Sequence, residues 1–267
     1  MQTKNKLETS HQLSIITVNL NNKEGLSKTL ASIANQSCQD FEYIVIDGSS
    51  TDGSVALIQD TSFIDRWISE KDTGVYDAMN KGIALATGSY LLFLNSGDQL
   101  FDHTVIENAM PKLTGEAIIY GNLQQAWTDT YRIHYFPEKL TFGHFLNQTI
   151  GHLSTFIRSD LFEKYGLYET EYKIVADWAF FTKVIVKENV SVKYIPDVVG
   201  TFDMNGMSSD PVNFEQINRE RRQFLRKHFG RFLDDYEQHE NTLQILKRIQ
   251  SSKGFRWLKA LGVKKFQ

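Results

Sequence analysis

The sequence predicts an α/β fold, a mostly parallel sheet with flanking helices, followed by a helical extension at the C-terminus. Through the first hundred residues, short apolar runs typical of buried strands alternate with amphipathic helical patterns. Two of these runs end in polar turns that carry acids, and the last fifth of the chain turns basic and helical. Such alternation places parallel strands at the centre and their crossover helices outside.

Each element of the first half follows from its own pattern. The apolar runs predict strands at residues 13–18, 41–46, 66–69 and 90–94. Helical periodicity predicts helices at residues 23–35, 54–59 and 75–86. Leu26, Leu30 and Ile33 share one face of the first helix, and the third helix ends near Gly88.

The pattern loosens after Asp98. It predicts strands at residues 117–120, 123–127, 131–136, 154–158 and 190–195, the last closed by Pro196. A helix is expected at residues 176–187, and the chain is expected to be helical from Pro211 onward. We therefore predict a polar tail (1–12), a sheet-bearing domain (13–210, with halves 13–100 and 101–210) and a basic helical extension (211–267).

Composition is that of an ordinary globular protein, with 41% hydrophobic residues, 23% charged residues and a net charge of −3. The single cysteine, Cys38, excludes an internal disulfide, so a reducing cytoplasm is the natural compartment. No apolar run approaches the roughly 18 residues that a membrane span needs, and residues 1–12 have no signal-peptide core.

The basic charge is concentrated in the extension. Residues 213–267 hold 13 Lys and Arg against six Asp and Glu, whereas the preceding part is acidic. Arg256 and Lys259 alternate with Phe255 and Trp257, a pattern that suits an anionic membrane surface. A solvated basic face on a packed helix is the alternative. Nucleic acid is disfavoured as a partner, because the body is acidic and carries no binding motif.

Acidic turns follow two predicted strands, at the edge where open parallel sheets bind ligands. Asp47 begins the turn after residues 41–46 and could accept hydrogen bonds from a ribose hydroxyl or a base N–H; its alternative role is an Asx turn. Asp98 closes the turn Asn-Ser-Gly-Asp after residues 90–94. It could hold a divalent cation shared with phosphates, with Asn95 adding a carbonyl oxygen. The alternative is a simple polar turn.

Asp177 stands alone among apolar and aromatic neighbours. Desolvation raises the proton affinity of such a carboxylate, which suits a general base. A helix N-cap is the alternative. His152 could orient a phosphate or an incoming hydroxyl, or it could be a satisfied structural histidine.

Several enzyme classes are excluded by missing motifs. The chain has no Gly-x-Gly-x-x-Gly after the first strand, no phosphate-loop Gly-Lys-Ser/Thr and no His-Glu-x-x-His. It also has no Gly-x-Ser-x-Gly elbow. Nicotinamide-dependent dehydrogenases, most phosphate-loop ATPases, α/β-hydrolases and zinc proteases of this type are therefore disfavoured.

The ordered motifs resemble those of the inverting family 2 glycosyltransferases, which have the GT-A fold. They occupy residues 14–19, 33–37, 45–53, 70–82 and 93–98, and the segment around Asp177 completes the series. The run Tyr-Asp-Ala-Met-Asn-Lys-Gly within residues 70–82 is similar to that of the branch that makes bacterial surface polysaccharides, including the colanic-acid type. The resemblance covers residues 13–208.

The resemblance implies a nucleotide-diphosphate sugar donor, with uridine expected. The first half (13–100) would bind this donor and the second half (101–210) the acceptor. The residues implied are Asp177 as base, Asp98 for Mn²⁺ or Mg²⁺, and Thr17, Asn19, Asp47 and Asp72 for the nucleotide-sugar. Beside them we name Asn95 as a further nucleotide-sugar residue, and His152 and Trp178 as candidates for acceptor or phosphate. Asn95 and Gly97 stand where many relatives carry Asp-x-Asp, which weakens the expectation of a metal.

The implied reaction transfers a sugar, with inversion, to a hydroxyl of a glycan or lipid-linked acceptor in surface polysaccharide synthesis. The enzyme would work in the cytoplasm, with its basic extension at the inner membrane as one option. Two alternatives stay open. A sugar nucleotidyltransferase would normally carry a Gly-rich basic loop after the first strand, which is missing here. A non-catalytic nucleotide-sugar-binding module is consistent with the reduced acidic motif.

Overall fold

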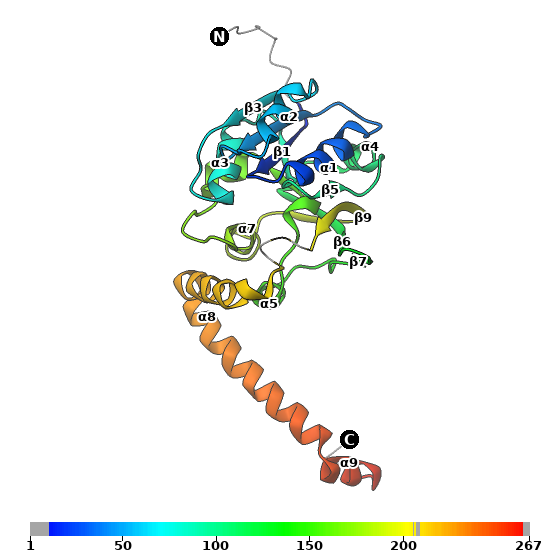
Figure 1. Cartoon of the computed structure of the whole chain (residues 1–267). Coiled ribbons are helices and arrows are strands. Elements are labelled where there is room, and N and C mark those ends of the chain that lie inside the picture. Colours follow the sequence, from blue (N-terminus) through cyan, green and yellow to red (C-terminus); the bar gives the residue numbers. More distant parts are fainter. Residues whose placement is uncertain (1–10, 205, 207–208, 264–267) are drawn as a thin grey trace. The chain divides into compact units, whose positions relative to one another are not determined.

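The computed structural model describes residues 11–204, 206 and 209–263. Predictions for residues 1–10 and 264–267 lie outside this range. The chain divides into two compact units, Met1–Ile217 and Asn218–Gln267 (Figure 1). The first unit holds the sheet and every residue of the site described below.

Within the described residues, nine strands form one sheet in the order β3-β2-β1-β4-β8-β6-β9-β5, with β7 paired to β6. The strands are β1 (Leu13–Asn19), β2 (Glu42–Asp47), β3 (Arg66–Ser69), β4 (Tyr90–Phe93), β5 (Gln99–Leu100), β6 (Ile118–Ala126), β7 (Tyr131–His134), β8 (Thr155–Arg158) and β9 (Val192–Asp203). The helices are α1 (Lys23–Ala34), α2 (Ser54–Asp60), α3 (Val75–Leu85), α4 (Val105–Ala109), α5 (Phe142–Asn147), α6 (Asp160–Tyr165), α7 (Ala176–Phe181), α8 (Phe214–Ser251) and α9 (Lys253–Ala260).

The first four strands in space are all parallel, as the sequence predicts. β1 lies between β2 and β4, and each of its residues is buried. This explains its continuous apolar pattern, because a central parallel strand is covered on both faces. In the register of these strands Asn19 pairs with Asp47, and Asp47 pairs with Ser69. The carboxyl ends of β1, β2 and β3 therefore meet at one edge of the sheet.

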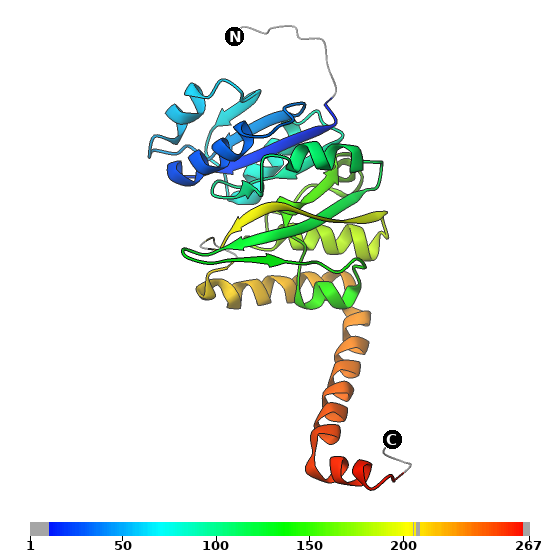
Figure 2. The same cartoon turned by 90° about the vertical axis from the view of Figure 1, so that its right-hand side faces the viewer.

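The second half of the sheet is mixed. β8 runs antiparallel to both β4 and β6, whereas β6 and β9 are parallel to each other. The long β6 and β9 lie side by side in Figure 2, coloured green and yellow. The predicted α/β class, a GT-A-like sheet with flanking helices and a helical C-terminal extension, is confirmed, with its all-parallel part limited to β3, β2, β1 and β4.

The predicted end of the last strand is wrong in this half. β9 continues through Pro196 to Asp203 instead of ending before the proline, because the register with β6 is irregular there: Tyr120 pairs with Tyr194, but Asn122 pairs with Val198. An irregular stretch tolerates a residue that has no N–H to donate. The predicted helix at 176–187 is α-helical only to Phe181 and continues as a π-helical segment, Thr182–Lys187.

The predicted C-terminal helices are present. α8 contains one residue with non-helical angles, Phe229 (φ −132°), which marks a kink between two helical stretches. The ribbon of α8 is bent in Figure 1. α9 has no buried residue, and its Trp257 is 66% exposed. Across the described part of the chain, no helix is both long enough and apolar enough to cross a membrane.

Candidate active site

The ends of β1 and β2 form a hydrogen-bonded pair. The Asn19 side-chain amide donates to Asp47 Oδ1 (2.9 Å) and to Ser50 Oγ (3.2 Å). Asp47 Oδ2 accepts from the Ser50 backbone N–H (2.9 Å) and from the Ser69 hydroxyl (2.7 Å). Burial raises the pKa of Asp47, but these bonds from Ser50, Ser69 and Asn19 outweigh it, so the pKa lies below its ordinary value. Asp47 is therefore an ionised turn residue.

Asp72 lies against the same turn. Its Oδ1 accepts from the Gly74 backbone N–H (3.0 Å), and its carboxylate packs over Gly48. A Cβ atom at Gly48 would stand 2.5 Å from Asp72 Oδ2, so this close approach requires glycine. The structure therefore brings Asn19, Asp47 and Asp72 together, three of the five residues predicted to contact the nucleotide-sugar.

Two predicted site residues lie elsewhere. Thr17 is wholly buried inside β1, where its hydroxyl accepts from the Tyr43 hydroxyl (2.9 Å). Trp178 is 1% exposed, and its indole N–H donates to the Phe145 carbonyl (2.8 Å). In this structure neither side chain reaches the surface of the site. Trp178 follows Asp177 directly, and consecutive residues on a helix point in different directions.

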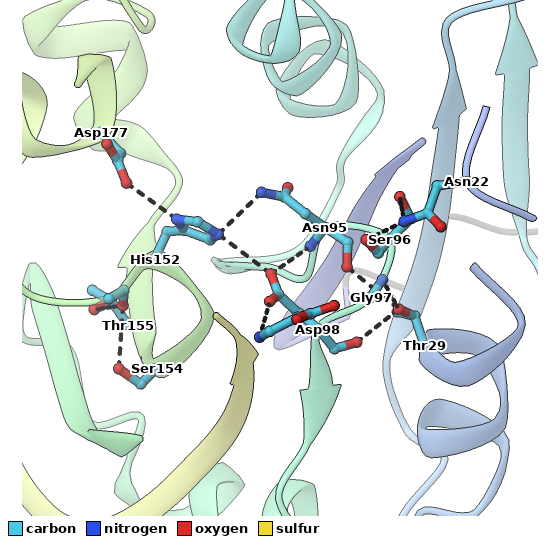
Figure 3. A network of polar contacts seen from close by, with 12 residues as sticks. Asn22, Thr29, Asn95, Ser96, Gly97, Asp98, His152, Ser154, Thr155 and Asp177 are labelled. Carbon is cyan, nitrogen blue, oxygen red and sulfur yellow. Dashed lines mark hydrogen bonds and ion pairs between the residues drawn. The ribbon is translucent and has the colours of Figure 1, made fainter. Parts of the chain in front are cut away.

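The turn after β4 holds the third acid, Asp98. Its carboxylate is 4% exposed and accepts from the backbone N–H groups of Asn95 (3.2 Å) and, weakly, Asp203 (3.4 Å). Thr29 of α1 holds the turn from below, since its hydroxyl donates to the Asp98 carbonyl (2.7 Å) and accepts from the Gly97 N–H (3.0 Å). Figure 3 shows these bonds around the turn.

His152 joins this turn to the predicted base. Its imidazole lies between Asp98 and Asp177, with Nδ1 3.1 Å from Asp177 Oδ2 and Nε2 3.6 Å from Asp98 Oδ2 (Figure 3). The Asn95 side-chain amide is also 3.2 Å from Nε2. Three segments that are distant in sequence therefore meet at one ring.

The two carboxylates keep this ring charged. Burial by itself lowers the pKa of His152, but its hydrogen bonds and charge interactions with Asp177 and Asp98 outweigh burial and raise the pKa to about 10. A protonated ring donates from both nitrogens. Asn95 Oδ1 is buried without a partner when its amide nitrogen faces Nε2, so we assign the amide the other way round, with Oδ1 accepting from His152.

Asp177 lies in the first turn of α7, two residues after the N-cap Val175, so the alternative that it caps the helix is wrong. Its Oδ1 accepts from the Trp178 backbone N–H (2.8 Å) and from the Tyr76 hydroxyl (2.8 Å), and its Oδ2 faces His152. Burial raises the pKa of Asp177, but His152, Tyr76 and the Trp178 N–H outweigh it and lower the pKa. The carboxylate is therefore ionised, and its side chain is 15% exposed.

Sequence reasoning missed Tyr76. It belongs to the Tyr-Asp-Ala-Met-Asn-Lys-Gly run, which supported the resemblance but received no chemical role. Its contact with Asp177 joins residues 101 positions apart. The available signal was a polar aromatic side chain inside a helix whose neighbours Ala78 and Met79 are apolar and buried.

The residues at Asp98 fit a cation only in partnership with phosphates. No cluster of three or more His, Cys, Asp or Glu side chains in the described chain could hold a metal ion. Asp98 supplies one carboxylate. Magnesium is commonly bound by one or two carboxylates while phosphate oxygens and waters complete its shell. The donor set therefore fits a metal ion that arrives with a diphosphate.

Comparisons with known proteins identify the family of the chain. The family model "Glycosyl transferase family 2" matches residues 14–165. The chain is 34% identical over 220 residues to a PGL/p-HBAD biosynthesis glycosyltransferase of Mycobacterium bovis, covering 77% of this chain and 82% of that one. It is 30% identical over 146 residues to the putative teichuronic acid biosynthesis glycosyltransferase TuaG of Bacillus subtilis, covering 52% and 58%.

Solved structures share the fold at low identity. S. aureus TarS 1–349 in complex with UDP superposes with a TM-score of 0.62 at 17% identity, covering 91% of this chain and 72% of that one. The mannosyltransferase PcManGT from Pyrobaculum calidifontis, in complex with GDP-Man and Mn²⁺, gives 0.59 at 17% identity, covering 84% and 64%. The chain spans 36% of a longer TarS chain.

These matches favour neither the nucleotidyltransferase nor the non-catalytic module that the sequence left open. The family model covers more than half of the chain, and the mycobacterial relative extends the match beyond it. The chain belongs to glycosyl transferase family 2 and is a glycosyltransferase.

Proposed function

We propose that this glycosyltransferase moves a sugar, with inversion, from a nucleotide-diphosphate sugar to a hydroxyl of a glycan or lipid-linked acceptor. UDP-sugar is the first candidate donor, since TarS has been solved with UDP and with UDP-GlcNAc. The names of the relatives, PGL/p-HBAD and teichuronic acid biosynthesis, support a role in cell-surface polysaccharide or glycolipid synthesis. The single observation that carries the mechanism is the bridge from Asp98 through His152 to Asp177.

The donor is assigned to the ends of the parallel strands. Asn19, Asp47 and Asp72 lie together there. Asp47 is fully buried and Asn19 is 3% exposed, so the half-buried Asp72 presents its carboxylate to a base or a ribose, while Asn19 and Asp47 hold the turn beside it. Asp98, with Asn95 beside it, lies at the next strand end and is assigned to the diphosphate through a shared Mn²⁺ or Mg²⁺. A bound cation would neutralise the negative charge that develops on the leaving diphosphate.

The acceptor is assigned to the Asp177 side of His152. The acceptor oxygen attacks the anomeric carbon and forms the new C–O bond, while the bond to the diphosphate oxygen breaks and its electron pair leaves with the nucleotide. Asp177 Oδ2 takes the hydroxyl proton, because Oδ1 already accepts from two donors. Attack from the face opposite the leaving group inverts the anomeric centre. One enzyme carboxylate suffices, in contrast to the two of glycoside hydrolases.

His152 supports both ends of this reaction. Its positive charge keeps Asp177 ionised before the acceptor binds, and the same charge lies beside Asp98, where the diphosphate is assigned. It also orients the base, since the Nδ1–H bond holds Asp177 Oδ2.

The basic extension is a second part of the proposal. We propose that residues 13–210 form the catalytic domain, with a half that binds the sugar donor and a half that binds the acceptor. Residues 211–267 form its extension, and the protein works in the cytoplasm. α9 presents the exposed Trp257 together with Lys253, Arg256 and Lys259 and buries none of its residues. Cationic residues around an exposed tryptophan favour the headgroups of an anionic leaflet, where a lipid-linked acceptor would be found.

Replacing Asp177 with Asn tests the base. The amide keeps the size of the side chain but cannot take a proton, so sugar transfer is expected to fall about 10²- to 10⁴-fold. Binding of UDP, measured by calorimetry, is expected to stay unchanged because the nucleotide residues are untouched. Transfer at the wild-type rate by a correctly folded Asp177→Asn variant would contradict the proposal.

Removing the metal tests the diphosphate end. Transfer by the EDTA-treated enzyme is expected to drop and to return with Mn²⁺, and Asp98→Asn is expected to need more Mn²⁺ for half-maximal rate. Asp40→Asn is the matched control, because the Asp40 side chain is 86% exposed. Full activity in EDTA, together with an unaltered Mn²⁺ requirement in Asp98→Asn, would show that Asp98 holds no cation.

Vesicle binding tests the extension. The full chain is expected to sediment with vesicles rich in phosphatidylglycerol more than with phosphatidylcholine vesicles, and less so at high salt. A chain ending at Ser251 is expected to lose the difference while keeping its thermal stability, since α9 buries no residue. Equal partitioning of the two proteins would rule out this membrane role for α9.

A further inference from the structure

The Tyr-Asp-Ala-Met-Asn-Lys-Gly run supplies Tyr76 to Asp177, and it lies between the two halves of the site. It occupies α3, which packs on β1 and β2. Gly82 allows this contact, because a Cβ atom there would collide with the Ile16 side chain. Tyr76 and Asn80 are four residues apart and therefore share a helix face. That face contacts the chain segment that leads into α7.

Asn80 holds the start of this segment. Its amide nitrogen donates to the Tyr168 carbonyl (2.9 Å), and its amide oxygen accepts from the Tyr168 backbone N–H (3.1 Å). These two hydrogen bonds, to the N–H and the carbonyl of the same residue, fix both the position and the rotation of the backbone there. The segment runs from this clamp to Asp177, nine residues later.

Tyr76 holds the other end. Its hydroxyl lies 2.8 Å from Asp177 Oδ1 and 2.7 Å from the Ile174 carbonyl oxygen. Both neighbours are acceptors, whereas the hydroxyl has one proton. Burial, followed by the charge of Asp177, raises the pKa of Tyr76 well above its ordinary value, so the hydroxyl stays protonated. The proton goes to the charged carboxylate, since hydrogen bonds to ionised acceptors are the stronger ones.

These contacts distinguish the two carboxylate oxygens. Oδ1 receives Tyr76 and the Trp178 N–H, which fills both of its lone pairs. Oδ2 receives His152, and among the described residues no second donor reaches it. The free lone pair on Oδ2 is the one that can take a proton.

We propose that Tyr76 is the positioning residue of the catalytic base: its hydroxyl fixes the rotation of the Asp177 carboxylate so that Oδ2 faces the acceptor hydroxyl. The inference rests on the proposed function, in which Asp177 is the base. It also gives the α3 run a role. Asp77 accepts a hydrogen bond from the Thr73 N–H (2.9 Å), next to Asp72, which is assigned to the nucleotide-sugar. One helix therefore joins the loop assigned to the nucleotide-sugar to the proposed base.

The test compares Tyr76→Phe with Tyr168→Phe. Both changes remove one buried hydroxyl from the same aromatic cluster, where the two ring centres are 5.6 Å apart. The Tyr168 hydroxyl is buried with no hydrogen-bond partner, so its loss is a matched control. Tyr76→Phe is expected to lower kcat about tenfold to 100-fold, with an unchanged KM for the donor, because a misplaced catalytic group affects the chemical step. Tyr168→Phe is expected to leave kcat unchanged.

A pH profile separates positioning from simple packing. The titratable groups that face Asp177 are His152, Tyr76 and Tyr168. The Tyr76 bond lowers the pKa of Asp177, so without it the pKa rises and the base is protonated at higher pH. The acid limb of the kcat profile is therefore expected to move to higher pH in Tyr76→Phe and to stay in place in Tyr168→Phe.

Should Tyr76→Phe fold poorly, 3-fluorotyrosine at position 76 offers a second variant. It keeps the shape of the side chain and makes its hydroxyl a stronger hydrogen-bond donor, so the acid limb of the kcat profile is expected to move to lower pH.

An unmoved acid limb and unchanged kcat in these variants, or equal losses in Tyr76→Phe and Tyr168→Phe, would overturn the inference. Loss of transfer in Asp177→Asn with normal Tyr76→Phe would refute only the role of Tyr76. Activity of Asp177→Asn would refute the base itself.

Discussion

One positively charged imidazole between two buried carboxylates is the constraint on which the site depends. Asp98 is 4% exposed and Asp177 15% exposed, so each charge needs a partner inside the protein. His152 serves both. A buried ion network of this kind contributes little net stability compared with an apolar core, but removing one member leaves the others uncompensated. We therefore interpret the network of Asp98, His152 and Asp177 as serving function rather than stability.

The sheet order explains how these residues meet. β8 is antiparallel to β4, and antiparallel neighbours place the start of one strand beside the end of the other. His152 lies in the turn just before β8, and Asn95 and Asp98 lie in the turn just after β4. A parallel β8 would put His152 at the opposite edge. The reversal between β4 and β8 thus places the turn that holds Asp98 beside the turn that holds His152.

The sequence predicted the parts of this site that depend on local patterns. The four parallel strands follow from apolar runs, and Asp47 and Asp98 follow from their places at strand ends. Asn19 and Asp72 were implied only by the family resemblance. Asp177 and His152 were named as candidates, but the contact of His152 with Asp98 depends on the antiparallel pairing of β8 with β4, which no local pattern reveals. Thr17 and Trp178 were misplaced, because motif proximity says nothing of the direction in which a side chain points.

Two further features depended on tertiary structure. Pro196 is a strand breaker by local rules, and only the irregular register with β6 lets β9 continue past it. In the sequence Tyr76 is an ordinary aromatic residue of a predicted helix, and only the three-dimensional structure shows its contact with Asp177. In both cases a long-range contact overrides a valid local expectation, and in the second that contact involves Asp177, the proposed base.

The most direct measurement is a crystal structure of the Asp177→Asn variant with an intact UDP-sugar and Mn²⁺. The account predicts that the diphosphate and the ion lie beside Asp98, that the nucleoside lies near Asn19 and Asp72, and that the anomeric carbon faces residue 177. A diphosphate bound away from Asp98, or a sugar turned away from residue 177, would contradict it.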